Sequence, residues 1–377
     1  MKKENIYFPN LNGLRFIAAF LVLIHHIEQF KVIYGVANSQ VKIPFIGIIG
    51  KLGVVLFFVL SGFLITYLLL VEEKTIKKIS ISKFYMRRIL RIWPLYFFII
   101  LLAFLVLPNI DIFILPNYGK DVIYSNLSWK LLLYVFFLPN LVLSLYGIVP
   151  YASHTWSIGT EEQYYLVWPV LLKHIKKYRV VLMFAIIIIY LAVKFFFTTS
   201  FASFIPHHKI LRSFWNSFPI DCMAIGGIYA ILLFQKHRFL KYLLRNDLFY
   251  ASILIVSILM IKGVRIPNFH YEFYSVFFGI IILNFSVNDK IKLSLENKIL
   301  NYLGSISYGL YMYHPIGIVL ALSISLSLDF STNWILYPLS LALTILMSSL
   351  SYTYFESFFL RFKKRFSYIR SGHAKAE

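Results

Sequence analysis

Apolar runs of about 20 residues recur from one end of the chain to the other, separated by short polar stretches. A run of this length is what an α-helix needs to cross the hydrocarbon core of a bilayer. The pattern therefore predicts an all-α polytopic membrane protein embedded in a lipid bilayer. Eleven apolar segments are expected, at residues 12–31, 47–71, 88–107, 129–146, 158–175, 179–197, 217–235, 247–264, 269–287, 305–327 and 334–358.

The charge distribution predicts which of these segments cross. If 129–146 does not cross, 26 of the 37 Lys and Arg residues fall on one side of the membrane, as the positive-inside rule requires of the cytoplasmic side. If it does cross, the basic stretch 173–179 falls outside. We therefore expect about ten transmembrane helices with both termini cytoplasmic. The segment 129–146, broken by Pro139–Asn140, would be a non-crossing or re-entrant helix.

Composition agrees with a membrane protein. Of 377 residues, 59% are hydrophobic and 14% are charged, whereas a soluble domain carries nearer a quarter charged residues. We expect a membrane-embedded domain at 1–360 and a basic cytoplasmic tail at 361–377. The net charge of +21 fits cytoplasmic loops facing anionic lipid and an anionic ligand, and no nucleic-acid partner is expected. The single cysteine, Cys222, excludes an intrachain disulfide and any multi-Cys metal site.

The first apolar segment carries ionisable residues. Arg15 and His26 are eleven positions apart, so on a helix they lie only about 20° apart around the axis and roughly 16 Å apart along it. A charged group within a membrane helix costs on the order of 2.5–3.5 kcal/mol, which favours a functional interpretation. The alternative is that Arg15 sits at the headgroup level and the histidine hydrogen-bonds to a neighbouring helix.

Two later stretches carry further candidate chemistry. Arg88 and Arg91, three residues apart on one helix face, could bind phosphate or carboxylate groups in a bidentate manner, or could anchor the helix at the headgroups. Glu161 and Glu162 lie in SHTWSIGTEEQYYLVWP, at the start of a helix. Their negative charge could interact favourably with the helix dipole, or one of them could orient a histidine that acts as a general base.

Three other polar positions lie within apolar segments. Ser61–Gly62 predicts close helix packing rather than a nucleophile. Asp221 requires a partner. His314 follows Tyr311 on one helix face, and a structural role is the simpler interpretation of a single histidine there.

Several stretches together resemble acyltransferase family 3, the bacterial integral-membrane O-acyltransferases of surface polysaccharides. The family opens with LDGLRgiAallVvlxH, and here the stretch is LNGLRFIAAFLVLIHH, with Asn12 in place of the usual Asp. Similar stretches follow in the family's order: FFVLSGFLI at 57–65, R-x-x-R at 88–91, WSIGTEEQYYLVWP at 156–169, ISYGLYMYHP at 306–315 and SYTYFES at 351–357.

The resemblance implies transfer of an acyl group, usually acetyl from cytoplasmic acetyl-CoA, to a hydroxyl of a surface or exported carbohydrate, such as lipopolysaccharide or a lipid-linked glycan. It implies an enzyme of the bacterial inner membrane, with no metal. His26 would be the catalytic histidine, with Arg15 its partner on the same helix and Glu161 assisting, while Arg88 and Arg91 would grip the anionic donor. His25, which points 100° away from His26, is the alternative base.

Two other classes of protein compete with this interpretation. A transporter or flippase could use the intramembrane Arg, His and Glu residues as a substrate or proton path, but no internal repeat is evident. A catalytically silent scaffold gives no reason to place Arg15 and His26 on one face of a membrane helix.

Overall fold

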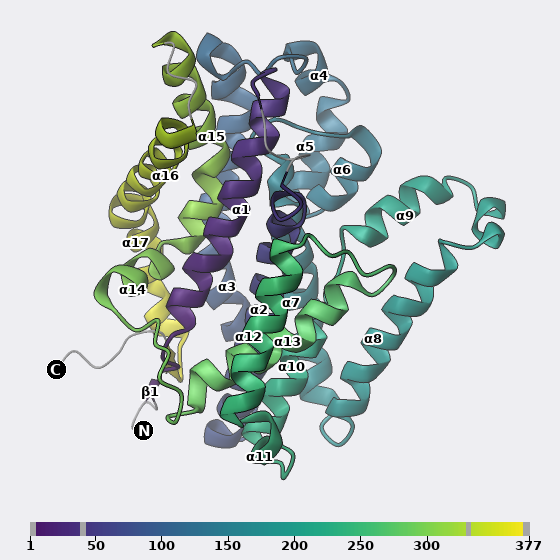
Figure 1. The fold of residues 1–377 in the computed structure, drawn as a ribbon. Helices are drawn as coiled ribbons and strands as arrows, with labels where there is room; N and C mark the ends of the chain where they lie inside the picture. Colours follow the sequence, from purple (N-terminus) through teal and green to yellow (C-terminus); the bar gives the residue numbers. More distant parts are fainter. Residues whose placement is uncertain (1–4, 38–42, 329–332, 372–377) are drawn as a thin grey trace.

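The computed structural model describes residues 5–37, 43–328 and 333–371, and these form a bundle of α-helices (Figure 1). The predicted all-α class is confirmed for these ranges, with one small addition. Two-residue strands β1 (Asn5–Ile6) and β2 (Arg370–Ser371) form a parallel pair that joins the two ends of the chain. The longer helices are α1 (Leu11–Ile33), α2 (Ile46–Ile76), α3 (Ile81–Leu101), α7 (Trp156–His174), α8 (Arg179–Phe196), α10 (Ile220–Phe234), α12 (Asn246–Ile261), α13 (His270–Val287), α15 (Ser307–Ser327) and α16 (Asn333–Leu350).

Shorter helices connect the long ones. They are α4 (Lys120–Tyr124), α5 (Leu127–Val135), α6 (Pro139–Tyr146), α9 (His208–Asn216), α11 (Leu240–Leu243), α14 (Lys298–Ser305) and α17 (Ser357–Lys363). Two π-helical stretches, η1 (Leu102–Val106) and η6 (Ser351–Glu356), continue α3 and α16, and 3-10 turns fill other connections, at Leu107–Asn109, Asp111–Phe113, Ser153–Thr155 (η4), Ser200–Phe204 and Lys364–Phe366.

Eight helices within the described residues are long and apolar enough to cross a membrane, compared with the ten expected. Two of the expected crossings, α7 and α12, are not among these eight. Helix α7 is 19 residues long but contains Glu161 and Glu162, and α12 has only 16 residues, about 24 Å. The remaining expected crossings match the eight candidates, with ends that differ by at most nine residues, and one candidate, His208–Phe234, joins α9 and α10 across the non-helical residues 217–219. The discrepancy therefore lies in two helices that are polar or short, and the orientation of the termini stays a prediction.

The stretch 129–146 forms two short helices instead of one crossing, as Pro139–Asn140 suggested. Helices α5 and α6 have nine and eight residues, so each is only about 12–14 Å long, which is less than half the thickness of the hydrocarbon core. Both lie at the end of the molecule opposite the chain termini (Figure 1). This agrees with the expectation that the segment does not cross.

Helix α2 lies at the centre of the bundle and contacts α1, α10 and α13. Its closest approach is to α10, where a Cβ added to Gly62 would lie 1.9 Å from the carbonyl oxygen of Met223, and one added to Gly226 would lie 2.1 Å from that of Val59. Only glycine permits two helix backbones to come this close. The predicted packing role of Gly62 is thus confirmed.

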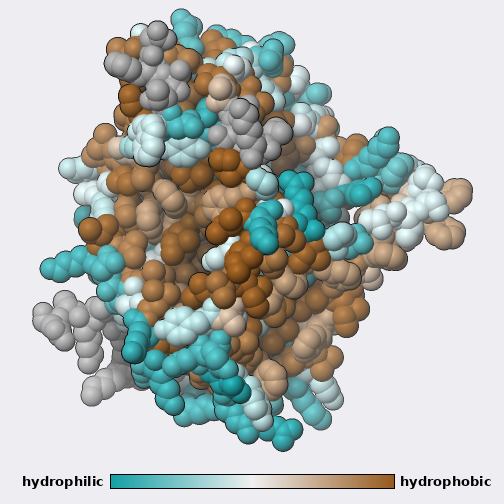
Figure 2. Space-filling view, viewed as in Figure 1, coloured by the Kyte–Doolittle hydropathy of each residue, from teal (hydrophilic) through white to brown (hydrophobic). Residues whose placement is uncertain are grey.

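On the face shown in Figure 2, polar residues gather toward both ends of the molecule and apolar residues cover most of its middle. The two ends of the chain lie at the same end of the bundle, as does α11 in the basic stretch 236–245 (Figure 1). Helix α17 runs across residue 360, so the polypeptide stays helical where the separate tail was expected to begin. We call this end, where the termini lie, the terminal end of the bundle.

Candidate active site

A cavity of about 180 Å³ lies toward the terminal end of the bundle, between α1, α2, α3, α7 and α15. The N-terminal residues Ile6, Tyr7 and Phe8 form one of its walls. The rest of the lining is formed by Leu11, Asn12, Arg15, Val54, Phe57, Ser61, Leu64, Ile65, Leu68, Arg88, Arg91, Ile92, Ser157, Ile158, Glu161, Tyr165, Ser307, Tyr308, Tyr311 and Lys363. Four of the five predicted site residues therefore meet in one place.

Cations dominate the polar part of this lining. Arg15 comes from α1, Arg88 and Arg91 from α3, and Lys363 from α17. Arg15 donates from Nη1 to Asn12 Oδ1 at 3.0 Å, and Arg88 lies 5.8 Å from the ring centroids of both Phe84 and Tyr165.

None of these four cations takes part in an ion pair with any described residue. The buried Arg88 Nε likewise has no hydrogen-bond partner among the described residues. The cavity therefore has uncompensated positive charge, which attracts an anionic ligand.

Glu161 is the carboxylate that faces the cavity. It accepts hydrogen bonds from Tyr165 Oη and, at 3.3 Å, from Ser61 Oγ. Its neighbour Glu162, about 100° further around α7, accepts instead from Trp93 Nε1 of α3 at 3.0 Å. The two adjacent carboxylates thus serve different contacts, and only Glu161 belongs to the cavity.

His26 lies outside this cavity, deeper in the bundle. Its Nδ1 is 2.9 Å from the carbonyl oxygen of Val22, which can only accept, so Nδ1 carries the hydrogen and Nε2 of the neutral ring has the lone pair. The ring is half-buried, and its centroid lies 4.6 Å from that of His314 on α15. His314 in turn lies 5.1 Å from His154 on η4. We call His26, His154 and His314 the histidine cluster.

The His25 ring lies edge-on to that of His26, with centroids 5.3 Å apart, but it packs toward α2 and is not counted in this cluster. Its Nδ1 lies 2.7 Å from the carbonyl oxygen of Ile46, and its ring packs on Gly50, where an added Cβ would approach to 2.4 Å. His25 thus fills the space between α1 and α2, whereas His26 faces α15.

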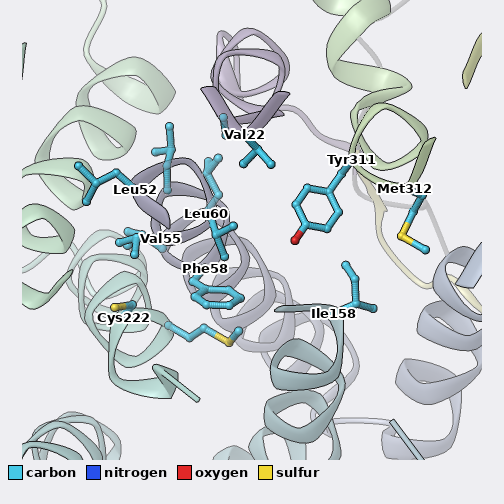
Figure 3. Close-up of a cluster of buried hydrophobic side chains, with 14 of the residues drawn as sticks. Val22, Leu52, Val55, Phe58, Leu60, Ile158, Cys222, Tyr311 and Met312 are labelled. Carbon is cyan, nitrogen blue, oxygen red and sulfur yellow. The ribbon is translucent and has the colours of Figure 1, made fainter. Parts of the chain in front are cut away.

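Tyr311 connects the cavity with the histidine cluster. Its ring lines the cavity and lies 5.6 and 5.7 Å from the rings of His154 and His314. Its hydroxyl donates to the carbonyl oxygen of His154 at 2.6 Å, which leaves Ser157 Oγ to donate to it at 2.7 Å. Figure 3 shows the hydroxyl directed into the bundle between α15 and α7, near Ile158. The cavity and the histidines are therefore neighbouring parts of one polar region.

Sequence reasoning did not assign His154 or Lys363 to the site. His154 lies in the stretch already singled out for Glu161, seven residues earlier, so proximity in sequence was a usable signal. Lys363 belongs to the expected tail, and no sequence signal predicts that α17 would bring it to the cavity. His314 has a neighbour that its expected structural role did not predict, the ring of His26.

The N-terminal wall of the cavity is held by Glu296, which lies outside the membrane-spanning helices. Glu296 accepts from the backbone N–H of Asn10 at 2.7 Å and from the hydroxyl of Tyr7. Partial burial opposes ionisation, but these hydrogen bonds and one from Asn301 outweigh it and lower the pKa of Glu296. Among the described residues, no group of three or more His, Cys, Asp or Glu side chains has the arrangement to hold a metal ion.

Comparison with known proteins identifies the family. A profile described as an acyltransferase domain, that of acyltransferase family 3, matches residues 8–353. The chain belongs to this family. Its bacterial relatives include a Staphylococcus aureus (strain COL) protein provisionally named an O-acetyltransferase, 26% identical over 94% of this chain and 58% of the relative.

Two further relatives carry more specific names. The O-acetyltransferase OatA of S. aureus (strain NCTC 8325 / PS 47) is 25% identical over 93% of this chain and 57% of its own length. The peptidoglycan O-acetyltransferase OatA of Listeria monocytogenes (strain ATCC BAA-679 / EGD-e) is 28% identical over 47% of this chain and 26% of its own. The chain spans somewhat more than half the length of the Staphylococcus relatives. No solved structure matches it significantly.

Proposed function

We propose that this acyltransferase moves an acetyl group from cytoplasmic acetyl-CoA to a hydroxyl of a cell-envelope carbohydrate. One observation carries the proposal: Tyr311 connects a cation-lined cavity at the terminal end of the bundle to the histidine cluster. The cations can bind an anionic thioester donor, and a histidine can remove the proton from the acceptor hydroxyl.

The donor occupies the cavity in this proposal. CoA carries a 3′-phosphate and a pyrophosphate, and Arg88 and Arg91 offer two guanidinium forks from one face of α3 to such groups. Arg15 is about 16 Å from His26 along α1, so it acts on the donor and not on the imidazole. Glu161 keeps Ser61 and Tyr165 in place and limits the positive charge of the cavity.

The transfer takes place beside His26, which the acyl end of the donor reaches past Tyr311. The acceptor oxygen attacks the thioester carbon while its proton passes to Nε2 of His26. The carbon–sulfur bond then breaks, and the proton goes to the CoA sulfur. A correctly placed general base contributes roughly 10²–10⁴-fold to such a reaction. The Nδ1 contact with Val22 supports His26 as this base, because it leaves the lone pair on Nε2.

The membrane arrangement belongs to the same proposal. Helices α7 and α12 cross in addition to the eight clear candidates, and the terminal end with its basic loops faces the cytoplasm of a bacterial inner membrane. One side of α7 packs against α2, α3 and α10, and Glu161 and Glu162 hydrogen-bond to residues of α2 and α3. The two carboxylates therefore face protein instead of lipid, which supports the proposal that α7 crosses the membrane. The relative named for peptidoglycan supports an envelope glycan as acceptor.

The test uses purified protein in lipid nanodiscs with acetyl-CoA and an N-acetylglucosamine tetramer as a soluble acceptor. We expect CoA release coupled to acetylation of the tetramer, measured as free thiol and by mass spectrometry. His26→Ala should reduce the rate about 10²–10⁴-fold. His270→Ala, which also removes a half-buried histidine, serves as the matched control and should keep the wild-type rate. A His26→Ala variant with full rate rejects this base, and wild-type protein that transfers no acetyl group from acetyl-CoA rejects the function.

A further inference from the structure

The two inner members of the histidine cluster have hydrogen-bonding capacity that nothing in the described chain uses. His154 and His314 are 7% and 1% exposed, and the Nε2 atom of each is buried without a hydrogen-bond partner among the described residues. A buried polar atom without a partner is costly, and such atoms in native proteins usually meet water or a ligand.

The Nε2 atom of His314 is an acceptor, because its Nδ1 donates to the carbonyl oxygen of Tyr311 at 2.6 Å. A neutral imidazole that donates through Nδ1 has its lone pair on Nε2. The missing partner of His314 Nε2 must therefore bring a hydrogen, which excludes a phosphate, a carboxylate or a carbonyl group at that atom. A hydroxyl group, which can donate or accept, also suits the unpartnered Nε2 of His154.

The neighbouring hydroxyls are not available to fill this role. The single hydrogen of Tyr311 is donated to the backbone of His154, and Ser157 donates to Tyr311 in turn. The rings that surround the two nitrogens are those of His26 and Tyr311, and His26 also donates through Nδ1 to backbone. The missing partners must come from a molecule that enters the cluster.

We propose that His154 and His314 bind hydroxyl groups of the acceptor, a polyol such as a sugar ring, and hold it against His26. This inference rests on the proposed function and deepens it by assigning the acceptor site. Because the two Nε2 atoms are covered while His26 is half-buried, an incoming hydroxyl meets His26 first. Neighbouring hydroxyls on one ring can then reach His314 and His154, whose rings follow at separations of 4.6 and 5.1 Å.

The experiment compares His154→Phe and His314→Phe with wild-type protein, because phenylalanine has a ring but no hydrogen-bonding atom, and uses His270→Phe as the control. Three quantities are measured in nanodiscs: the Kd for CoA, the KM for the N-acetylglucosamine tetramer, and kcat. Loss of one hydrogen bond to the tetramer should raise its KM about five- to tenfold in each variant. The Kd for CoA should not change, and His270→Phe should match wild type in all three quantities.

A permethylated tetramer provides a second arm, because it keeps the sugar rings but has no O–H to donate. Used as a competitive inhibitor of the unmodified tetramer, it should have a low affinity for wild-type protein, no higher than its affinity for either variant. A permethylated tetramer that competes with wild type as well as the unmodified tetramer does would overturn the proposal.

Other outcomes also overturn it. A fall in kcat with unchanged KM in both variants would assign the pair to the chemical step, and loss of CoA binding together with tetramer binding would assign it to folding. The proposed function fails separately, through absence of acetyl transfer by wild type. Acetyl transfer with an unchanged KM in both variants leaves that function standing and removes only the acceptor site.

Discussion

The imidazole rings of His26 on α1 and His314 on α15 lie 4.6 Å apart, although these residues come from opposite ends of the sequence. Each ring donates through Nδ1 to a backbone carbonyl of its own helix, Val22 for the first and Tyr311 for the second. Both lone pairs are therefore carried on the outer nitrogens. The pairing shows how contact between the first helix and α15 builds a site that neither helix contains alone.

Replacing Arg88 or Arg91 by Lys should weaken donor binding, even though the charge is kept. Lysine offers a point charge without the guanidinium fork that grips phosphate through two parallel bonds. We expect the Kd for CoA to rise about tenfold, with little change in the KM for the acceptor. Arg361→Lys, at an exposed position beyond the cavity, is the control and should bind CoA as wild type does. Equal CoA affinity in all three variants would mean that the cavity is not the donor site.

Enlarging Gly62 should destabilise the bundle. An added Cβ would lie 1.9 Å from a backbone carbonyl oxygen of α10, so the two central helices must separate, and Gly62→Ala should cost about 2–4 kcal/mol of folding free energy. Gly309→Ala places its Cβ 3.1 Å from Ser348 Cβ, so only a small adjustment is needed and the loss should be smaller. Thermal unfolding in detergent, followed by size-exclusion chromatography, compares the two. An unchanged melting temperature for Gly62→Ala would contradict the close α2–α10 contact.

In the cluster of Lys194, Glu272 and Asp221, replacing the lysine should lower folding stability much more than replacing the aspartate. Lys194 on α8 bonds Glu272 on α13 at 2.7 Å, and Asp221 of α10, fully buried beside Glu272, has no hydrogen-bond donor among the described residues. Lys194→Met leaves two buried carboxylates without a cation and should cost about 3–5 kcal/mol.

Asp221→Asn tests the same cluster in the opposite direction. It replaces the carboxyl group beside Glu272 with a neutral amide, which can supply an N–H group to Glu272 Oε2, an atom that lacks a partner among the described residues. We expect it to be neutral or stabilising in the same thermal assay. Strong destabilisation by Asp221→Asn, comparable with that of Lys194→Met, would show that the Asp221 charge is required.

The contact between Glu296 and the N-terminal wall of the cavity should weaken in acid. Because hydrogen bonds lower the folded-state pKa of Glu296 below its unfolded value, its stabilising contribution is complete above the unfolded pKa of about 4.3. That contribution is lost as the pH falls through the folded-state pKa. Glu296→Gln should therefore lower the melting temperature at pH 7, and its difference from wild type should shrink as the pH is lowered below 4. A difference that stays constant with pH would exclude a role for the carboxylate charge.

The length of the apolar runs was enough to predict the helical class and eight helices that are long and apolar enough to cross a membrane, and Pro139–Asn140 was enough to predict the break in 129–146, because these features depend on local sequence. The length of the runs was not enough to establish that α7 and α12 cross, because α7 contains Glu161 and Glu162 and α12 has only 16 residues. The shared face of Arg15 and His26 follows from helical periodicity. Their separation into a cavity and a histidine cluster does not, since Tyr311 of α15 lies between the two. Lys363 and His154 reach the site only through long-range packing.

The pairing of β1 with β2 has a practical consequence. The first and last described residues of the polypeptide lie together, and the strand residue Ile6 with its neighbours Tyr7 and Phe8 also lines the cavity. Fluorophores attached at strands β1 and β2 would consequently sit close together beside this wall. Energy transfer between them would then report any displacement of this wall when a nucleotide thioester arrives, without altering a single residue inside the bundle.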